Sequence, residues 1–224
     1  MTALIVILVE GQTEEAFVNQ VLQPFIGTSV AYLQPIVVHT SRTADGTTFR
    51  GGGKWAHYEA QLRRLLHQPH WSLITTMIDF YGYPSDAPQC DCTSVHAQPG
   101  CATSRERAIA RTFAYDSRFE PFLALHEFKT LVIAAGAASG DVLGRSDVAD
   151  TFRSLVAEVS DNAELINDGP ATAPSKRVLL ALPDYSKVRD GVAVLEDDLG
   201  PALAFTPRFR EWVERLRRVG MDSD

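Results

Sequence analysis

The stretch Leu4-Ile-Val-Ile-Leu-Val-Glu-Gly11 decides the fold class. Its first six residues are apolar and mostly β-branched, which is typical of a short buried strand. A strand that is apolar on both faces belongs in a mostly parallel sheet with helices on either side. Glu10-Gly11 then interrupts the apolar run, so we expect the strand to end there and the chain to turn.

A helix is expected directly after this turn. Phe17, Val21 and Leu22 recur near helical spacing, and Thr13 is a suitable N-cap at the start. Pro24 is the expected end, because proline interrupts a helix. The chain therefore opens with a strand, a tight turn and a helix.

The same alternation continues along the chain. We expect further strands at 32–39, 73–78 and 122–125, and a glycine-rich loop at 40–54. We expect helices at 55–67, 105–115, 128–135, 148–159, 175–182 and 207–219. The predicted fold class is α/β, with a mostly parallel sheet flanked by helices and a helical C-terminal elaboration.

Composition narrows the class of protein. The chain has 224 residues, 45% hydrophobic and 22% charged, which suits one globular unit. The apolar run 4–9 is far too short to cross a membrane and has no basic segment before it, so we expect a cytoplasmic protein without membrane contact. A net charge of −7 opposes independent binding of duplex DNA through a basic surface. Any grip on nucleic acid must be local or supplied by a partner.

Acidic residues follow two of the predicted strands. Glu10 and Asp79 each stand where a strand stops, and ligands of parallel α/β sheets collect at those ends. With Glu14 one turn into the next helix, they offer the oxygen ligands that Mg²⁺ or Mn²⁺ prefers. A purely structural interpretation is also open. Glu14 and Glu15 suit the first turn of any helix, and an aspartate after a strand often caps the next element.

Several motifs together resemble a bacterial family of uncharacterised Toprim-like proteins, related to the Toprim domains of overcoming-lysogenization-defect (OLD) nucleases. The resemblance spans nearly the whole chain. Its motifs are Val9-Glu-Gly-Gln-Thr-Glu-Glu15, Thr76-Met-Ile-Asp-Phe-Tyr-Gly-Tyr-Pro84, Leu125-His-Glu-Phe128, Leu165-Ile-Asn-Asp-Gly-Pro170 and Ala173-Pro-Ser-Lys-Arg177.

The resemblance implies a Toprim fold and metal-dependent cleavage of DNA or RNA. Residues 1–140 would form the Toprim-like core, and 141–224 a helical extension packed on it. Glu10 matches the first-strand glutamate, and Asp79 the first aspartate of the Asp-x-Asp motif. Tyr81 replaces the second aspartate of that motif and offers no ionised ligand near neutral pH.

The missing carboxylate is then expected from Glu14 or Glu127, both of which lie in the motifs. In this hypothesis Mg²⁺ or Mn²⁺ is held by Glu10, Asp79 and one of these two glutamates, and activates water for attack on a phosphodiester. Lys176 neutralises charge on the phosphate. Alternatively, Ser175 is only an N-cap and Lys176 lies on a solvated helix face.

The resemblance also suggests partners. Such proteins are often encoded beside ATPases and suspected in phage defence, and this chain has no Walker motif of its own. We therefore expect a nuclease subunit that acts on nucleic acid, with DNA as the expected substrate, together with a separate ATPase. The alternatives are a non-catalytic Toprim-like adaptor, which Tyr81 favours, and a nucleotide phosphohydrolase. The sequence leaves the oligomeric state open.

Two further features carry alternatives. Cys90, Cys92, His96 and Cys101 offer donors for a structural Zn²⁺, or belong to a polar insertion with incidental thiols. The last predicted helix is basic, either as an interaction face or as a solvated helix balanced by Glu211 and Glu214. Its basic residues are Arg208, Arg210, Arg215, Arg217 and Arg218.

Overall fold

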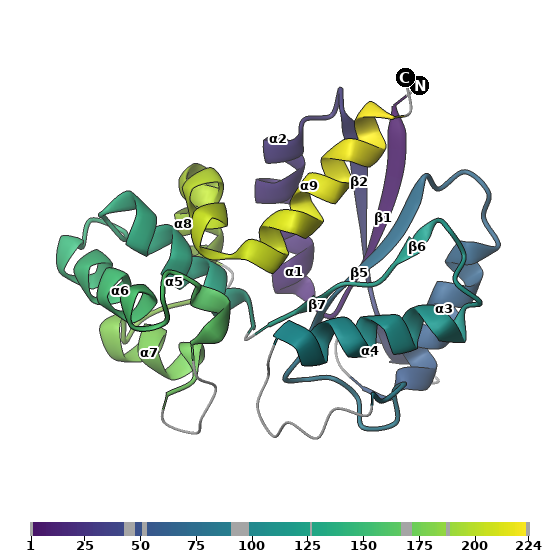
Figure 1. Ribbon diagram of the computed structural model, residues 1–224, viewed down its shortest axis with the longest axis horizontal. Helices are drawn as coiled ribbons and strands as arrows, with labels where there is room; N and C mark the ends of the chain where they lie inside the picture. The colour runs from purple at the N-terminus through teal and green to yellow at the C-terminus, as the bar shows by residue number, and fades with distance from the viewer. Residues whose placement is uncertain are drawn as a thin grey trace.

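The computed structural model describes residues 2–42, 48–50, 53–90, 99–125, 127–166, 172–186 and 189–222, of which 40–42, 48–50 and 127 are described by their backbone alone. Within these residues the chain forms a parallel sheet between layers of helices, with a group of helices beside it (Figure 1). The α/β fold with a helical C-terminal elaboration is thus confirmed.

The sheet is built around the opening apolar run. Strand β1 (Ala3–Val9) lies between β2 (Ala31–Val37) and β5 (Leu73–Asp79) and pairs with both in parallel. On the far side of β5 lie two short parallel strands, β6 (Phe119–Glu120) and β7 (Leu123–Ala124). The order β2-β1-β5-β6 makes β1 and β5 the interior of the sheet. This position explains why residues 5–9 are fully buried.

Alternate residues of β1 face two different hydrophobic cores. Ile5, Ile7 and Val9 pack in the larger core with the first helices and the last one. Val6 and Leu8 pack in the second core, against α3 (Trp55–Leu66) and α4 (Pro99–Thr112). The two-residue period of a strand therefore fixes both layers of helices.

The first helical stretch is longer than predicted. It runs through α1 (Gln12–Phe17), the π-helical segment η1 (Val18–Leu22) and α2 (Gln23–Ile26). Its N-cap is Gly11, so the assignment of Thr13 as N-cap was wrong. Pro24 does not end the helix, because it occupies the first turn of α2, where its missing N–H costs little.

The glycine-rich stretch expected as a loop contains a small hairpin. Strands β3 (His39–Arg42) and β4 (Thr48–Arg50) pair in antiparallel fashion, with an irregular register between His39 and Ser41. The expectation of a continuous loop at 40–54 was therefore wrong. These strands are only four and three residues long, too short for an alternating pattern to stand out among the glycines around them.

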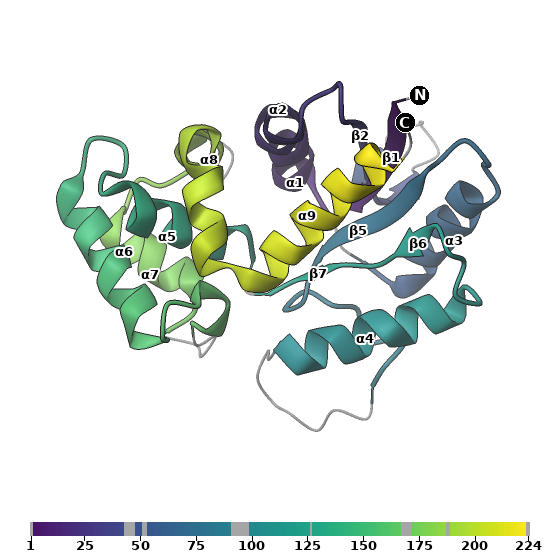
Figure 2. The same cartoon turned by 45° about the horizontal axis from the view of Figure 1, so that its top comes forward.

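The helical elaboration lies beside the sheet (Figures 1 and 2). Helix α5 (Glu127–Ser139) packs against α6 (Ser146–Glu158), α7 (Pro174–Ala181) and α8 (Arg189–Ala202), and α9 (Pro207–Met221) returns across β1 and β2. Helix α5 therefore belongs by its contacts to the helical elaboration, although it precedes residue 140. Helix α9 belongs by its contacts to the sheet, although it follows residue 140. The short 3-10 turn η2 (Ala163–Leu165) lies between α6 and α7 in the chain, and η3 (Leu203–Phe205) joins α8 to α9.

Candidate functional site

The strand order reverses beside β1, and the region outside the carboxyl ends of β1 and β5 at this reversal is called the crevice here. From β1 the chain moves to β2 on one side, and then returns to β5 on the other side of β1. In open α/β sheets, ligands bind at such a reversal of strand order, outside the carboxyl ends of the strands. Glu10 follows β1 directly and Asp79 is the last residue of β5, so both stand at this reversal.

Glu10 and Asp79 are brought together as the sequence predicts. Glu10 Oε2 accepts a hydrogen bond from the backbone N–H of Asp79 at 3.3 Å. Asp79 also has the structural role considered for it, because its Oδ1 accepts from the backbone N–H of Tyr81 at 2.9 Å and shapes the following turn. The Tyr81 side chain, in place of the second aspartate, is 71% exposed.

Two glycines let the backbone lie close to these carboxylates. A Cβ on Gly82 would lie 3.3 Å from Glu10 Oε1 and 3.9 Å from the Asp79 Cβ. A Cβ on Gly11 would lie 3.1 Å from Glu14 Oε2. The turns after β1 and β5 therefore run close to the carboxylates of Glu14 and Glu10.

The loop after β5 is fixed to both helices of its layer. The Arg105 guanidinium of α4 stacks over Phe80 at 4.5 Å and over Tyr83 at 5.0 Å. Asp86 Oδ1 accepts a hydrogen bond from the Trp55 N–H at 2.9 Å and so caps the start of α3. These contacts hold the turn that carries Asp79 in one position.

Tyr58 is a member of this neighbourhood that the sequence did not reveal. Its side chain is fully buried in α3, and its hydroxyl has no hydrogen-bond partner among the described residues. Burial raises the pKa of the phenol, and the negative charges of Glu10, Glu14 and Asp79 raise it further. Three carboxylates therefore act on one buried hydroxyl, and the region concentrates negative charge that a cation would offset.

The donor chemistry suits a hard divalent cation, but the described side chains do not complete a ligand set. Across them, no group of three or more His, Cys, Asp or Glu residues is arranged to hold a metal ion. The side chain of Glu127 lies outside the described atoms, as does His126. The backbone of Glu127 begins α5 shortly after Ala124, which pairs with Asp79. Glu14 lies one turn into the first helix.

Lys176 lies on α7, a helix of the C-terminal elaboration that packs against α5 and does not directly follow a strand of the sheet. Its side chain is exposed and forms no hydrogen bond or ion pair with another described residue. The assignment of Ser175 as N-cap was wrong, since Ala173 is the N-cap and Pro174 the first helical residue. Proline at that position already has the required φ and needs no N–H partner.

The cysteine loop lies largely outside the described residues. Cys92 and His96 fall within 91–98, which the structure does not describe. Cys90 is a free, partly exposed thiol, and Cys101 at the start of α4 takes part in a disulfide. A disulfide sulfur is not a thiolate ligand, so only a set without Cys101 would remain for zinc in this state.

Fold and crevice together define an α/β protein with paired carboxylates at a reversal of strand order. The family model described as "Domain of unknown function (DUF4276)" matches residues 9–217, and the chain belongs to this family. No curated protein and no solved structure matches the chain. In the described part of the chain, no helix is both long and apolar enough to pass through a membrane.

Proposed function

We propose that this protein is a metal-dependent phosphodiesterase of Toprim-like fold that cleaves nucleic acid, with DNA as the expected substrate. The observation that carries the proposal is the meeting of Glu10 and Asp79 at the reversal of strand order, with Glu14 close enough to act on the same buried Tyr58. Convergent carboxylates at this place in an α/β sheet are suited to holding a divalent cation.

Each residue has a stated part in this proposal. Glu10 and Asp79 hold Mg²⁺ or Mn²⁺, together with Glu14 or Glu127. When bound, the cation supplies positive charge to the phosphate and lowers the pKa of water. Gly82 lets the backbone of the following turn lie close to the Glu10 carboxylate, where a Cβ would be only 3.3 Å from Oε1. Lys176, which has no partner among the described residues, supplies charge to the phosphate.

A second candidate function is a Toprim-like adaptor that binds a partner or nucleic acid without cutting. Two observations favour it. Tyr81 stands in place of a carboxylate, and no three-ligand group forms among the side chains that are described. A nucleotide phosphohydrolase would use the same carboxylates on a smaller substrate.

The cellular setting follows from the same proposal. We place the protein in the cytoplasm, as the nuclease subunit of an anti-phage defence system that works with a separately encoded ATPase. A contact with such a partner suits α7, where Leu180 is 85% exposed and Leu179 is 41% exposed. A structural Zn²⁺ in the cysteine loop would require the disulfide of Cys101 to be reduced.

The test compares cleavage with metal binding in the same variants. Supercoiled plasmid, single-stranded DNA and RNA are incubated with the protein in Mg²⁺, Mn²⁺ or EDTA. Glu10→Ala and Asp79→Ala are expected to abolish cleavage and to weaken Mn²⁺ binding measured by calorimetry. Glu15→Ala, in the same helical turn as Glu14, is the matched control and should retain both.

The outcomes separate the candidate functions. Metal-dependent cleavage that is lost in both variants supports the nuclease. Binding of nucleic acid without cleavage, unchanged in both variants, supports the adaptor. Release of phosphate from nucleotides without cleavage of polynucleotides supports the phosphohydrolase.

A further inference from the structure

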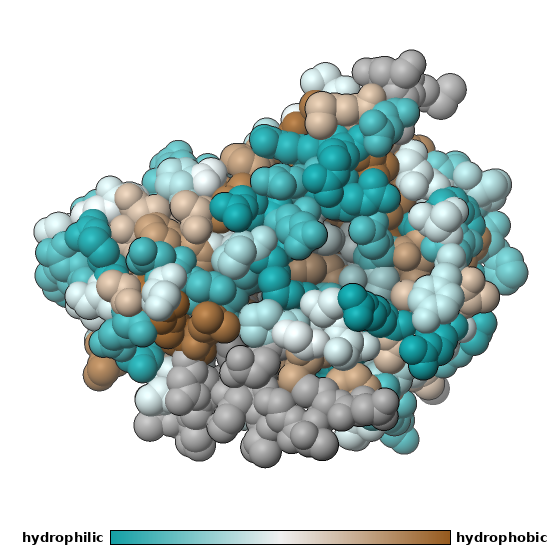
Figure 3. Space-filling model, in the orientation of Figure 1, coloured by the Kyte–Doolittle hydropathy of each residue, from teal (hydrophilic) through white to brown (hydrophobic). Residues whose placement is uncertain are grey.

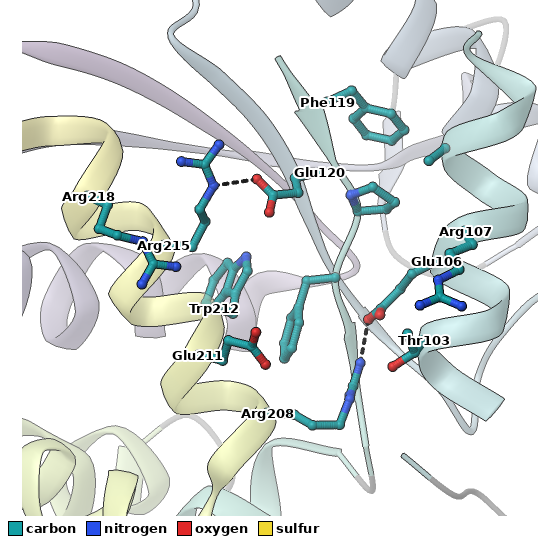
Figure 4. Close-up of a pocket in the computed structure, with 13 residues that line it drawn as sticks. Thr103, Glu106, Arg107, Phe119, Glu120, Arg208, Glu211, Trp212, Arg215 and Arg218 are labelled. Carbon is teal, nitrogen blue, oxygen red and sulfur yellow. Dashed lines mark hydrogen bonds and ion pairs between the residues drawn. The ribbon is translucent and has the colours of Figure 1, made fainter. Parts of the chain in front are cut away.

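A groove of about 410 Å³ lies along the edge of the sheet, between α4 and α9 (Figure 4). Its floor is the segment that joins β6 to β7, and its walls are the facing sides of the two helices. Figure 3 shows hydrophilic side chains gathered over α9. The residues that matter here are Arg107, Arg208, Arg215, Arg218, Phe122 and Trp212.

The aromatic side chains of the groove, Phe122 and Trp212, leave no open ring face on which a nucleic-acid base could stack. Phe122 stacks on Trp212 with centroids 4.8 Å apart and planes at 13°, and the Arg208 guanidinium lies over the Phe122 ring at 5.4 Å. Trp212 Nε1 donates to Thr75 Oγ1 at 3.0 Å, which fixes the indole in the core. Since the ring faces are already covered, a base cannot stack on them, and recognition must come from the charged walls.

Two of the four arginines are already neutralised. Arg208 pairs with Glu106 at 2.6 Å, and Arg215 pairs with Glu120 at 2.7 Å. Arg107 on α4 and Arg218 on α9 are exposed and have no hydrogen-bond or ion-pair partner among the described residues. Figure 4 shows them on opposite walls. The lining also holds the exposed Glu211 on α9, so its four arginines and three glutamates give the groove a formal charge of +1, which favours an anionic ligand in a chain of net charge −7.

The groove begins one strand away from the carboxylate crevice. Ala124 of β7 pairs with Asp79, and the preceding Leu123 bonds to both Glu106 and Arg208 of the groove walls. From there the groove continues along β6, away from the strand ends. An extended ligand in the groove would therefore reach the crevice at one end.

We propose that the α4–α9 groove binds the phosphates of a single nucleic-acid strand through Arg107 and Arg218, and leads that strand to the Glu10–Asp79 crevice. This inference rests on the proposed function, because the crevice gives the bound strand its reacting end. It adds a substrate class: a single strand, held by its backbone and without preference for base sequence. Guanidinium groups form forked hydrogen bonds to phosphate oxygens, which suits this role.

The test measures binding in EDTA, so that cleavage plays no part. Fluorescence anisotropy follows labelled single-stranded DNA of mixed sequence with the full chain. The double variant Arg107→Ala/Arg218→Ala is expected to bind about tenfold more weakly, and its plot of log affinity against log salt to be shallower by about 1.4, from two lost phosphate contacts. Arg64→Ala/Arg210→Ala removes the same charge from exposed positions outside the groove lining and should bind like the wild type.

Other outcomes overturn the inference. Equal weakening in both double variants would show a response to net charge alone. Unchanged binding in Arg107→Ala/Arg218→Ala would exclude the groove, and equally strong competition by polyglutamate would exclude phosphate as the recognised group. Thermal unfolding of each variant confirms that it is folded.

The inference and the proposed function fail separately. If the wild type binds through the groove but no metal supports cleavage, the groove stands and the nuclease fails. If Glu10→Ala abolishes cleavage while the groove variant binds and cuts like the wild type, the nuclease stands and the groove fails.

Discussion

Glu106 of α4 and Arg208 of α9 form an ion pair at 2.6 Å although they are 102 residues apart in the sequence. Both also bond the backbone of Leu123, whose N–H donates to Glu106 Oε1 at 2.8 Å and whose carbonyl accepts from Arg208 at 3.0 Å. On the side facing β5, the hydrogen bonds go to the neighbours of Leu123: Ile78 N–H donates to the Phe122 carbonyl, and Phe80 N–H, just after β5, donates to the Ala124 carbonyl. The pair thus covers the edge of the sheet, where an open backbone invites pairing with another chain.

Removing one partner of this pair should destabilise the protein. The two side chains are only 14% and 15% exposed, so Arg208→Ala leaves a nearly buried carboxylate without its cation. We expect a loss of about 3 kcal/mol in the free energy of unfolding, measured by urea denaturation. The double variant Glu106→Gln/Arg208→Met removes both charges and should recover part of this loss. A double variant less stable than Arg208→Ala would contradict the explanation.

The buried carboxylate of Glu164 should make stability depend on pH. Glu164 is 3% exposed and accepts from the backbone N–H groups of Arg208 at 2.8 Å and Phe209 at 3.1 Å, which caps α9. Burial raises the pKa of this carboxyl above its ordinary 4.5, while these hydrogen bonds partly oppose the shift. The folded protein therefore binds the proton more tightly than the unfolded chain does.

The contribution of Glu164 to stability is then fully present below pH 4.5 and is lost as the pH rises through its folded-state pKa. We expect the free energy of unfolding of the wild type, minus that of Glu164→Gln, to grow as the pH falls from about 7 toward 4.5. Glu158→Gln, at an exposed position on α6, is measured alongside as the control for removing one carboxylate outside the core. A flat profile for Glu164→Gln would sink the prediction.

Gly136 should not tolerate a methyl group, although alanine favours helices. It lies in α5, where a Cβ would meet Val142 and would lie 2.8 Å from Phe152 Cδ2 of α6. We expect Gly136→Ala to lower the free energy of unfolding by about 2 kcal/mol, measured by chemical denaturation. Gly100 in α4 has nothing within 4 Å of its Cβ position, so Gly100→Ala should be neutral or stabilising by up to about 1 kcal/mol. Equal effects would contradict this account of close helix packing.

Tyr81→Asp should strengthen metal binding at the crevice. It restores a carboxylate two residues after Asp79, at an exposed position whose backbone already bonds to that aspartate. We expect Mn²⁺ affinity to rise by about tenfold in calorimetry, because cation affinity increases with ligand charge. Tyr115→Asp, at another exposed tyrosine, controls for added negative charge. The same gain in both variants would show that Tyr81 has no special place.

Much of the sheet could be predicted from the sequence because its strands are buried on both faces. Such strands are continuous apolar runs, as in residues 4–9 and 73–78, and they end where a polar residue begins. The meeting of Glu10 and Asp79 follows from that rule alone. Helix α8 was missed because Gly191 and Gly200-Pro201 resemble turn signals, although Val192, Leu195 and Leu199 pack against the core.

The rest of the site depends on contacts between distant segments, which periodicity does not encode. Tyr58 lies on the buried side of α3, and nothing in its neighbouring residues indicates that three carboxylates lie near its hydroxyl. The α4–α9 groove likewise depends on α9 returning to the sheet rather than staying with α5–α8. The basic composition of the last helix was visible in the sequence, but its facing partner was not.

The return of α9 to β1 has a consequence for synthesis on the ribosome. Strand β1 leaves the ribosome long before α9, yet Ile5, Ile7 and Val9 share their core with Trp212, Val213 and Leu216 of that helix. Until that last helix emerges, one apolar face of the nascent sheet lacks part of its cover and is open to aggregation or chaperone capture. Late closure by distant contacts also predicts slow folding of the released chain.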